Sequence, residues 1–283
     1  MRHIEFIHTS HFEDHYYRHC VTGRLSLFID YFWQTNFEKL WVQYPKGFSD
    51  MLFPNLGYTY LVNLGTPFTM QVGKNKIPMK GDGFLPRFSQ MEAFHKPGNS
   101  LFGIKFKVSP VIFEKEVDFS EYSDAVYPLS YLLEPELITG IKKAAGFDKR
   151  VKLLSRHYEK MLDTYQGSLQ PVNIVTSIFD ACEQRNVFNP SVEELAGSYG
   201  ISARTLQRYF KTTTGMSSKR ALQVLRIRKA LHTMISHPKT FDHSQFGYYD
   251  LSHYYKHLKQ FLHKDSLMKL NPYLKLLQTV RKK

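Results

Sequence analysis

The segment from Ser191 to Gly215 restricts the fold more than any other part of the 283-residue chain. Ser191 and Glu194 have the spacing of a capping box, in which each side chain binds a free amide at the start of a helix. Gly200 supplies a residue that tolerates positive φ just after such a helix, and Ser202 can cap a second helix directly afterwards. The pattern therefore predicts two short helices joined by a tight turn.

The second predicted helix has one apolar side and one cationic side. Leu206, Tyr209 and Phe210 share the apolar side. The opposite side carries polar side chains at i, i+3, i+4 and i+7, namely Arg204, Gln207, Arg208 and Lys211. Arg and Gln can each hydrogen-bond a base edge in two places, Arg on guanine and Gln on adenine. This spacing favours a DNA-reading helix over a charged face that is merely solvated.

The net charge of +13 is concentrated in the same part of the chain. Residues 171–283 hold 18 Lys and Arg against 7 Asp and Glu and so carry +11, whereas residues 1–170 hold 20 against 18. Such a distribution is typical of a two-domain protein in which one half meets a polyanion. A basic solvated surface is the alternative.

Residues 191–231 closely resemble the first half of the AraC/XylS-type DNA-binding domain. The matching residues are Ala196, the turn Gly200 to Ser202, Leu206, Arg208, Phe210, Gly215 and the run Arg226 to Ala230. Residues 246–261 are similar to the second signature of the same family. There the informative positions are filled by Gly247, Asp250, Ser252, Tyr254, Lys256 and Lys259.

The resemblance implies an all-α DNA-binding domain over residues 171–283 with two helix-turn-helix units, at about 191–212 and 239–261, joined by one helix. Each unit would lay a recognition helix in the major groove of double-stranded DNA. The implied base contacts are Arg204, Gln207, Arg208, Leu251, Ser252, Tyr255 and Lys256. The implied phosphate contacts are Ser202, Thr205, Lys211 and Lys259. The segment HPKTFDHSQF replaces the usual alanine-rich helix of the second unit, so the first unit is expected to be the main base reader.

Residues 1–110 predict a β-rich domain, because short aromatic and β-branched segments alternate with Gly, Pro and Asn between Gly23 and Val108. VGKNKIPM predicts a hairpin. Together with the resemblance, this predicts an α+β protein with an N-terminal cupin-like β-barrel or sandwich that senses a ligand or dimerises. The aromatic residues could line a ligand pocket, although filling of a small core is the favoured interpretation.

Residues 111–170 predict a helical linker or dimer region. Within DKRVKLLSRHYEKMLDTY, apolar residues recur at helical spacing at Leu154, Tyr158, Met161, Leu162 and Tyr165. The stripe could pack on its own domain or on a partner subunit, and dimerisation is the favoured interpretation. GSLQP at 167–171 is the predicted domain boundary.

Few residues support catalysis or metal binding. A metal cupin needs two histidines and a carboxylate in one short motif, but residues 21–110 contain only His95. His15 and His19 have the i, i+4 spacing of a zinc site on a helix, although ordinary surface or packing histidines are the favoured interpretation. No G-x-S-x-G, P-loop or G-x-G-x-x-G motif is present. We therefore expect no enzymatic activity, no cofactor and no metal.

The chain also lacks signals for membranes and export. No apolar run approaches the ~20 residues that span a bilayer, and the first residues lack the apolar core of a signal peptide. We expect a cytoplasmic transcription regulator of bacterial type, with no membrane association. Its expected partners are double-stranded DNA, a small-molecule effector, a second copy of the chain and RNA polymerase.

The alternative from another class is an enzyme, such as an alkyl-transfer DNA-repair protein, fused to an AraC-like module. Such proteins depend on reactive or zinc-bound cysteines. The two cysteines of this chain, Cys20 and Cys182, lie in unrelated contexts.

Overall fold

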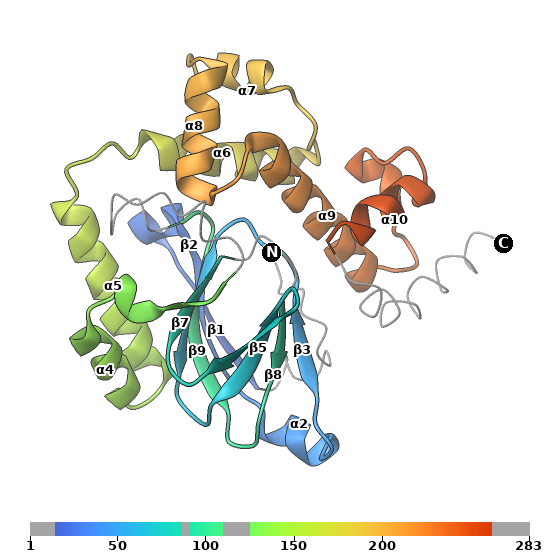
Figure 1. The fold of residues 1–283 in the computed structure, drawn as a ribbon. Coiled ribbons are helices and arrows are strands. Elements are labelled where there is room, and N and C mark those ends of the chain that lie inside the picture. The colour runs from blue at the N-terminus through green and yellow to red at the C-terminus, as the bar shows by residue number, and fades with distance from the viewer. Residues whose placement is uncertain (1–14, 87–90, 110–124, 262–283) are drawn as a thin grey trace.

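The short aromatic segments of the N-terminal part form two antiparallel sheets (Figure 1). The computed structural model describes residues 15–86, 91–109 and 125–261. One sheet has the strand order β1 (Tyr16–Cys20), β2 (Ile29–Asn36), β9 (Ser100–Phe106), β4 (Tyr58–Asn63), β7 (Gly83–Pro86), β10 (Tyr127–Pro128). The other has the order β3 (Ser49–Leu52), β8 (Met91–Phe94), β5 (Phe68–Val72), β6 (Asn75–Met79).

The two sheets do not close on each other. In the described part of the chain, β1 and β10 stay at opposite edges of the larger sheet, and no strand joins it to the smaller one. The predicted α+β class is therefore confirmed, whereas the cupin-like barrel is not. The predicted VGKNKIPM hairpin is confirmed, because β5 and β6 pair from Phe68 opposite Met79 to Val72 opposite Asn75.

The larger sheet is buried on both faces. Tyr31, Trp33 and Leu61 point into an apolar layer against the smaller sheet. Their strand neighbours Phe32 and Tyr60 point to the opposite face and join a second, larger cluster. Because both faces are covered, all six residues of β4 are buried, and the strand lacks the polar and apolar alternation of a half-exposed sheet.

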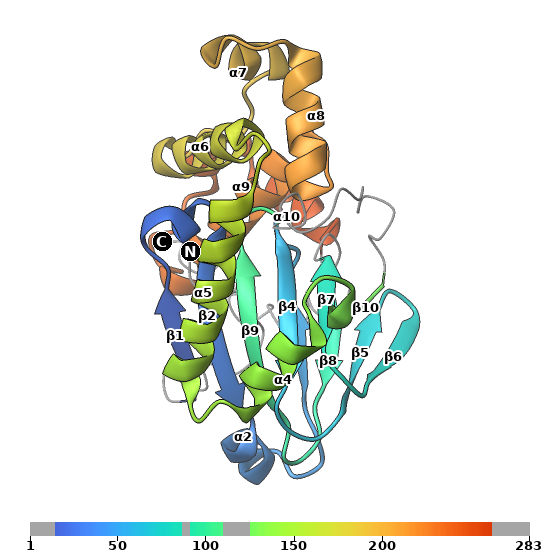
Figure 2. The same ribbon diagram turned by 90° about the vertical axis from the view of Figure 1, so that its left-hand side faces the viewer.

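Helices α4 (Pro135–Lys143) and α5 (Phe147–Thr164) cover the outer face of the larger sheet (Figure 2). Tyr158 of α5 is fully buried, and its ring meets Phe28 and Phe106 edge-on at centroid distances of 5.6 and 5.9 Å. Leu154 and Leu162 are buried on the same side of the helix. The apolar stripe that suggested a dimer helix thus packs on its own domain, and dimerisation stays a prediction without that support.

The described N-terminal segment from His15 to Cys20 is not helical. His19 belongs to β1, where successive side chains alternate between faces. The helical spacing considered for His15 and His19 does not exist, so a zinc site of that geometry is wrong. Among the described residues, no group of three or more His, Cys, Asp and Glu is arranged to hold a metal ion. His3, His8 and His11 lie outside those residues.

The C-terminal part is helical as predicted. It comprises α6 (Gln170–Arg185), α7 (Val192–Ser198), α8 (Ala203–Thr214), α9 (Ser218–Ser236), the 3-10 helix η4 (His243–Phe246) and α10 (Leu251–Lys259). The remaining short helices lie in the N-terminal part and are η1 (Gly23–Leu27), α2 (Glu38–Gln43) and η3 (Leu129–Tyr131). None of the described helices is long and apolar enough to cross a bilayer.

The helical part is joined to the sheet part by hydrogen bonds that involve three helices. Thr176 of α6 donates to the Leu27 carbonyl at 3.1 Å, and the Ser109 amide donates to the Thr213 carbonyl of α8 at 2.6 Å. The buried guanidinium of Arg228 in α9 donates to the carbonyls of Pro54 at 2.6 Å and Phe53 at 3.4 Å. One continuous apolar cluster also runs from the sheet into these helices.

Arg228→Ala should lower the free energy of unfolding by about 1–3 kcal/mol, because the buried Pro54 carbonyl would lose a charge-assisted hydrogen bond. Urea unfolding of the full chain measures the change. The exposed Arg204→Ala serves as the matched control and should stay within about 0.5 kcal/mol of the wild type. An Arg228→Ala protein as stable as this control would show that the hydrogen bond from Arg228 to Pro54 does not stabilise the fold.

Candidate nucleic-acid interface

Hydrogen bonds at the helix N-caps fix where the two helices of the first helix-turn-helix unit begin. The Ser191 side chain accepts from the Glu194 amide at 3.1 Å, and the Glu194 side chain accepts from the Ser191 amide at 2.8 Å, so the predicted capping box is confirmed. Gly200 has φ of +64° in the turn. Ser202 then accepts from the Thr205 amide at 3.1 Å and starts α8.

Helix α8 is buried on one side and exposed to solvent on the other. Leu206 and Phe210 are fully buried, and the Phe210 ring meets Phe179 of α6 edge-on at 5.7 Å. The opposite arc presents the exposed cations Arg204, Arg208 and Lys211. In both views α8 projects from the end of the molecule away from the sheets (Figures 1 and 2). The geometry leaves this cationic arc accessible to a large partner.

The other residues expected on this arc are engaged within the protein. The Ser202 hydroxyl donates to the Thr205 hydroxyl at 2.9 Å in addition to its capping role. Thr205 is half-buried. The half-buried Gln207 donates from Nε2 to the Ser218 hydroxyl at 2.9 Å and accepts from the Ser218 amide at 3.2 Å.

The second unit has a reduced first helix. Its place is taken by the four-residue η4, whose start is capped by Asp242, followed by Gly247 with φ of +72°. Asp250 caps α10 by accepting from the His253 amide at 2.6 Å. The polar HPKTFDHSQF segment offers few apolar side chains for a full helix, and Phe241 and Phe246 stack at 5.9 Å to fill its core.

Counting from the two N-caps places α8 and α10 in register. Leu206 and Tyr254 are the fourth residues after Ser202 and Asp250, and both are fully buried. The second, sixth and ninth residues are exposed in both helices, and in α10 they are Ser252, Lys256 and Lys259. Leu251 and Tyr255 are only half-buried and lean toward the core. Of the residues predicted for α10, Ser252, Lys256 and Lys259 therefore form its accessible face.

Comparison with known proteins agrees with this arrangement. A helix-turn-helix domain family matches residues 195–264, a range that starts within α7 and includes all of α10. No curated protein matches the chain.

Residues 195–264 form an AraC-type helix-turn-helix domain. The chain therefore contains a DNA-binding domain of this type.

Three solved structures match this one over about three quarters of the chain, at low sequence identity. ToxT from Vibrio cholerae has 11% identity over 74% of this chain and 88% of its own, with a TM-score of 0.42. A structure described as fatty-acid-bound ToxT from V. cholerae strain SCE256 has 10% identity over 76% and 88%, with a TM-score of 0.43. The AraC-like transcriptional activator CuxR has 12% identity over 79% and 88%, with a TM-score of 0.33.

One exposed residue of the second unit was not singled out from the sequence. Tyr249 directly precedes the Asp250 cap, and 91% of its surface is exposed. The corresponding residue of the first unit, Ile201, is partly covered by the core. An aromatic residue just ahead of the cap of a recognition helix was the only available signal.

The second unit is supported beneath α10 by contacts among Arg226, Tyr248 and His257. Arg226 of α9 donates from Nε to the Phe246 carbonyl at 2.7 Å, and its guanidinium lies 3.8 Å from the centre of the Tyr248 ring. The Tyr248 hydroxyl in turn lies 2.6 Å from Nδ1 of His257. Burial raises the pKa of Tyr248, against the opposing effect of the Arg226 charge. Burial, reinforced by the Arg226 charge, lowers the pKa of His257 to about 4.

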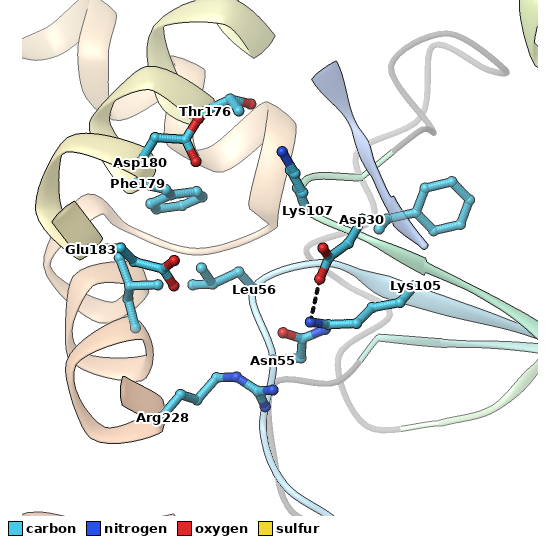
Figure 3. Close-up of a pocket in the computed structure, with 12 residues that line it drawn as sticks. Asp30, Asn55, Leu56, Lys105, Lys107, Thr176, Phe179, Asp180, Glu183 and Arg228 are labelled. Atoms are coloured by element: carbon cyan, nitrogen blue, oxygen red, sulfur yellow. Dashed lines mark hydrogen bonds and ion pairs between the residues drawn. The ribbon is translucent and has the colours of Figure 1, made fainter. Parts of the chain in front are cut away.

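The protein also contains a small cavity of about 70 Å³ where its two parts meet, lined by both polar and apolar residues (Figure 3). Asp30, Asn55 and Lys105 line it from the sheet side, and Glu183 and Arg228 from α6 and α9. Lys105 binds Asp30 at 2.6 Å. Burial would raise the pKa of Asp30, but the charge and hydrogen bond of Lys105 outweigh it and the pKa is lowered. Burial raises the pKa of Glu183.

Neither of the two cysteines lies in this cavity. Cys182 is buried in α6, and burial raises its pKa to about 11, so its thiolate is disfavoured. Cys20 is exposed on β1. The buried Cys182 therefore offers no activated nucleophile to the repair-enzyme alternative.

The free energy of unfolding should fall as the pH drops from about 6.5 toward 4, because His257 is protonated in the unfolded chain before the folded one. The folded pKa of about 4 lies below the usual value, so this contribution to stability is present above about pH 6.5 and lost on acidification, by on the order of 3 kcal/mol. Urea unfolding across this pH range measures it. His257→Gln retains an acceptor for the Tyr248 hydroxyl and should flatten the slope. An unchanged slope in that variant would show that other groups cause it.

Proposed function

We propose that this regulator binds a specific DNA operator with both helix-turn-helix units, and that α8 supplies most of the base recognition. The observation that carries the proposal is the arc of Arg204 and Arg208, which are exposed on a helix whose other side is fixed by Leu206 and Phe210. A guanidinium held in this way can bind the two acceptors of a guanine edge. Helix-turn-helix proteins present such groups from the first turns of the second helix.

The remaining cations fit a supporting role on the DNA backbone. Lys211 and Lys259 occupy the ninth position after each cap and are exposed. A lysine is a compact charge suited to phosphate, and the +11 carried by residues 171–283 supplies the general attraction. In α10, Ser252 and Lys256 take the positions of Arg204 and Arg208. A hydroxyl discriminates less sharply between bases than a guanidinium, so the second unit would act partly as an anchor.

Arg208→Ala should reduce affinity for the selected operator by about 1–3 kcal/mol and relax the preference at one base position. Selection from a randomised DNA pool identifies the operator, and titration of single-base variants gives the preference at each position. Lys211→Ala is the matched control on the same face. It should weaken binding to all sequences alike, because a phosphate contact carries no sequence information. An unaltered base profile in Arg208→Ala would remove Arg208 from the reading set.

A second proposal concerns the small-molecule effector. We propose that the cavity between the two parts receives it, since residues of the sheet and of α6 and α9 line the same space. The Nδ2 of Asn55 is buried there without a hydrogen-bond partner in the described structure, and a buried donor is stabilised by a ligand that accepts from it. A ligand in this position could favour one arrangement of the two parts over another.

A small polar metabolite that binds this cavity should raise the melting temperature of the wild type, by mass action on the folded state. Asn55→Leu has a similar size but no donor, and should lose most of that shift. A thermal-shift screen of small carboxylic acids, sugars and amines tests both proteins together. Hits that shift the two proteins equally would place the effector elsewhere. Dimerisation and contact with RNA polymerase remain predictions.

A further inference from the structure

The strongest unassigned feature of the DNA-binding domain is the joint between α8 and α9. Gln207 uses both ends of its amide on one residue: Nε2 donates to the Ser218 hydroxyl and Oε1 accepts from the Ser218 amide. Ser218 is 3% exposed, so both bonds lie away from bulk water. A side chain committed in this way is not free to extend toward a base edge without breaking two hydrogen bonds.

The position of Ser218 explains why a partner is needed there. It is the first residue of α9, where an amide has no carbonyl acceptor within its own helix. The cap residue Ser217 accepts from the Arg220 amide at 3.3 Å, two residues after Ser218. Oε1 of Gln207 supplies an acceptor for the Ser218 amide instead. Through the Gln207 side chain, α8 therefore supplies the hydrogen-bond acceptor that the first amide of α9 lacks within its own helix.

The second unit supports the same division of roles. Gln207 is the fifth residue after its cap, and the fifth residue after Asp250 is Tyr255. Tyr255 is also half-buried, and its ring contacts the fully buried Tyr254 at 5.5 Å. In both units the fifth position thus faces the interior of the domain, whereas the second and sixth positions are exposed.

We infer that Gln207 is a positioning residue that locks α8 to the start of α9, and that the base-reading positions of each unit are the second and sixth after the cap. The inference rests on the proposed function of α8 as a base reader and narrows its reading set to Arg204 and Arg208. It reassigns Gln207, which its residue type and spacing had placed among the base readers.

Gln207→Glu separates the two roles. If residue 207 only positions α8, the glutamate carboxylate can still accept hydrogen bonds from the Ser218 amide and the Ser218 hydroxyl. The positive end of the α9 dipole also favours its charge. Operator preference should then stay unchanged at every base position, with a uniform fall in affinity of no more than about tenfold from the added negative charge. If residue 207 reads a base, Gln207→Glu should instead change the preferred base at that position from adenine to cytosine. Selection from randomised DNA decides between them, and such an exchange would overturn the inference.

The hydrogen-exchange rate of the Ser218 amide tests the clamp between Gln207 and Ser218 directly, because a residue that only contacts bases would not affect this rate in the free protein. In free protein, Gln207→Ala should speed this exchange by more than about tenfold, while Gln207→Glu restores the protection. Arg208→Ala is the control and should leave the Ser218 amide as protected as in the wild type. Unchanged exchange in a folded Gln207→Ala protein would overturn the clamp. If the wild type selected no operator at all, the proposed function would fail, while the exchange measurement would still test the clamp.

Discussion

The arrangement of the whole molecule depends on α9, a mostly buried helix that contacts α6, α8, η4 and the sheet part. Three nearly consecutive cations on it bind main-chain carbonyls in three different places. Arg226 binds Phe246 in the second unit, Arg228 binds Pro54 in the sheet part, and Lys229 lies 3.4 Å from the Glu183 carbonyl of α6. A buried guanidinium is tolerated only where acceptors surround it, and the ends of neighbouring elements supply them here. Rotation of α9 would therefore cost hydrogen bonds to all three neighbours at once.

This central helix also makes the two recognition helices unequal. Helix α8 is capped by Ser202, makes an edge-on aromatic contact to α6 and is joined to α9 by two hydrogen bonds from Gln207, and α7 before it starts with a full capping box. Helix α10 rests on η4, on the stack of Arg226 and Tyr248, and on the uncharged His257. The first unit holds its side chains on a rigid base, which precise base recognition requires. The support of the second unit instead includes His257, which becomes protonated on acidification.

Much of the helical half could be predicted from local sequence. Capping boxes, positive-φ glycines and the cation arc depend on residues within four or five positions of each other, and local geometry suffices to place them. The sheet half was less predictable. Strands were foreseen from their aromatic and β-branched composition, but closure into a barrel depends on which edges pair, and that is decided by contacts far apart in the chain. The apolar stripe of α5 was equally ambiguous, because an amphipathic helix is the same whether its own sheet or another subunit covers it.

The sequence by itself determined where the DNA-binding domain lies, where its helices start and which side of α8 is cationic, because these follow from hydrogen bonds and side-chain periodicity within one or two turns. Only the tertiary structure decided how the polar residues on that side are used. Arg204 and Gln207 belong to the same side by spacing, yet Arg204 extends into solvent while Gln207 is bound to Ser218, eleven residues away. The distinction depends on where the start of α9 passes α8. Periodicity along a single helix carries no information about the position of its neighbour.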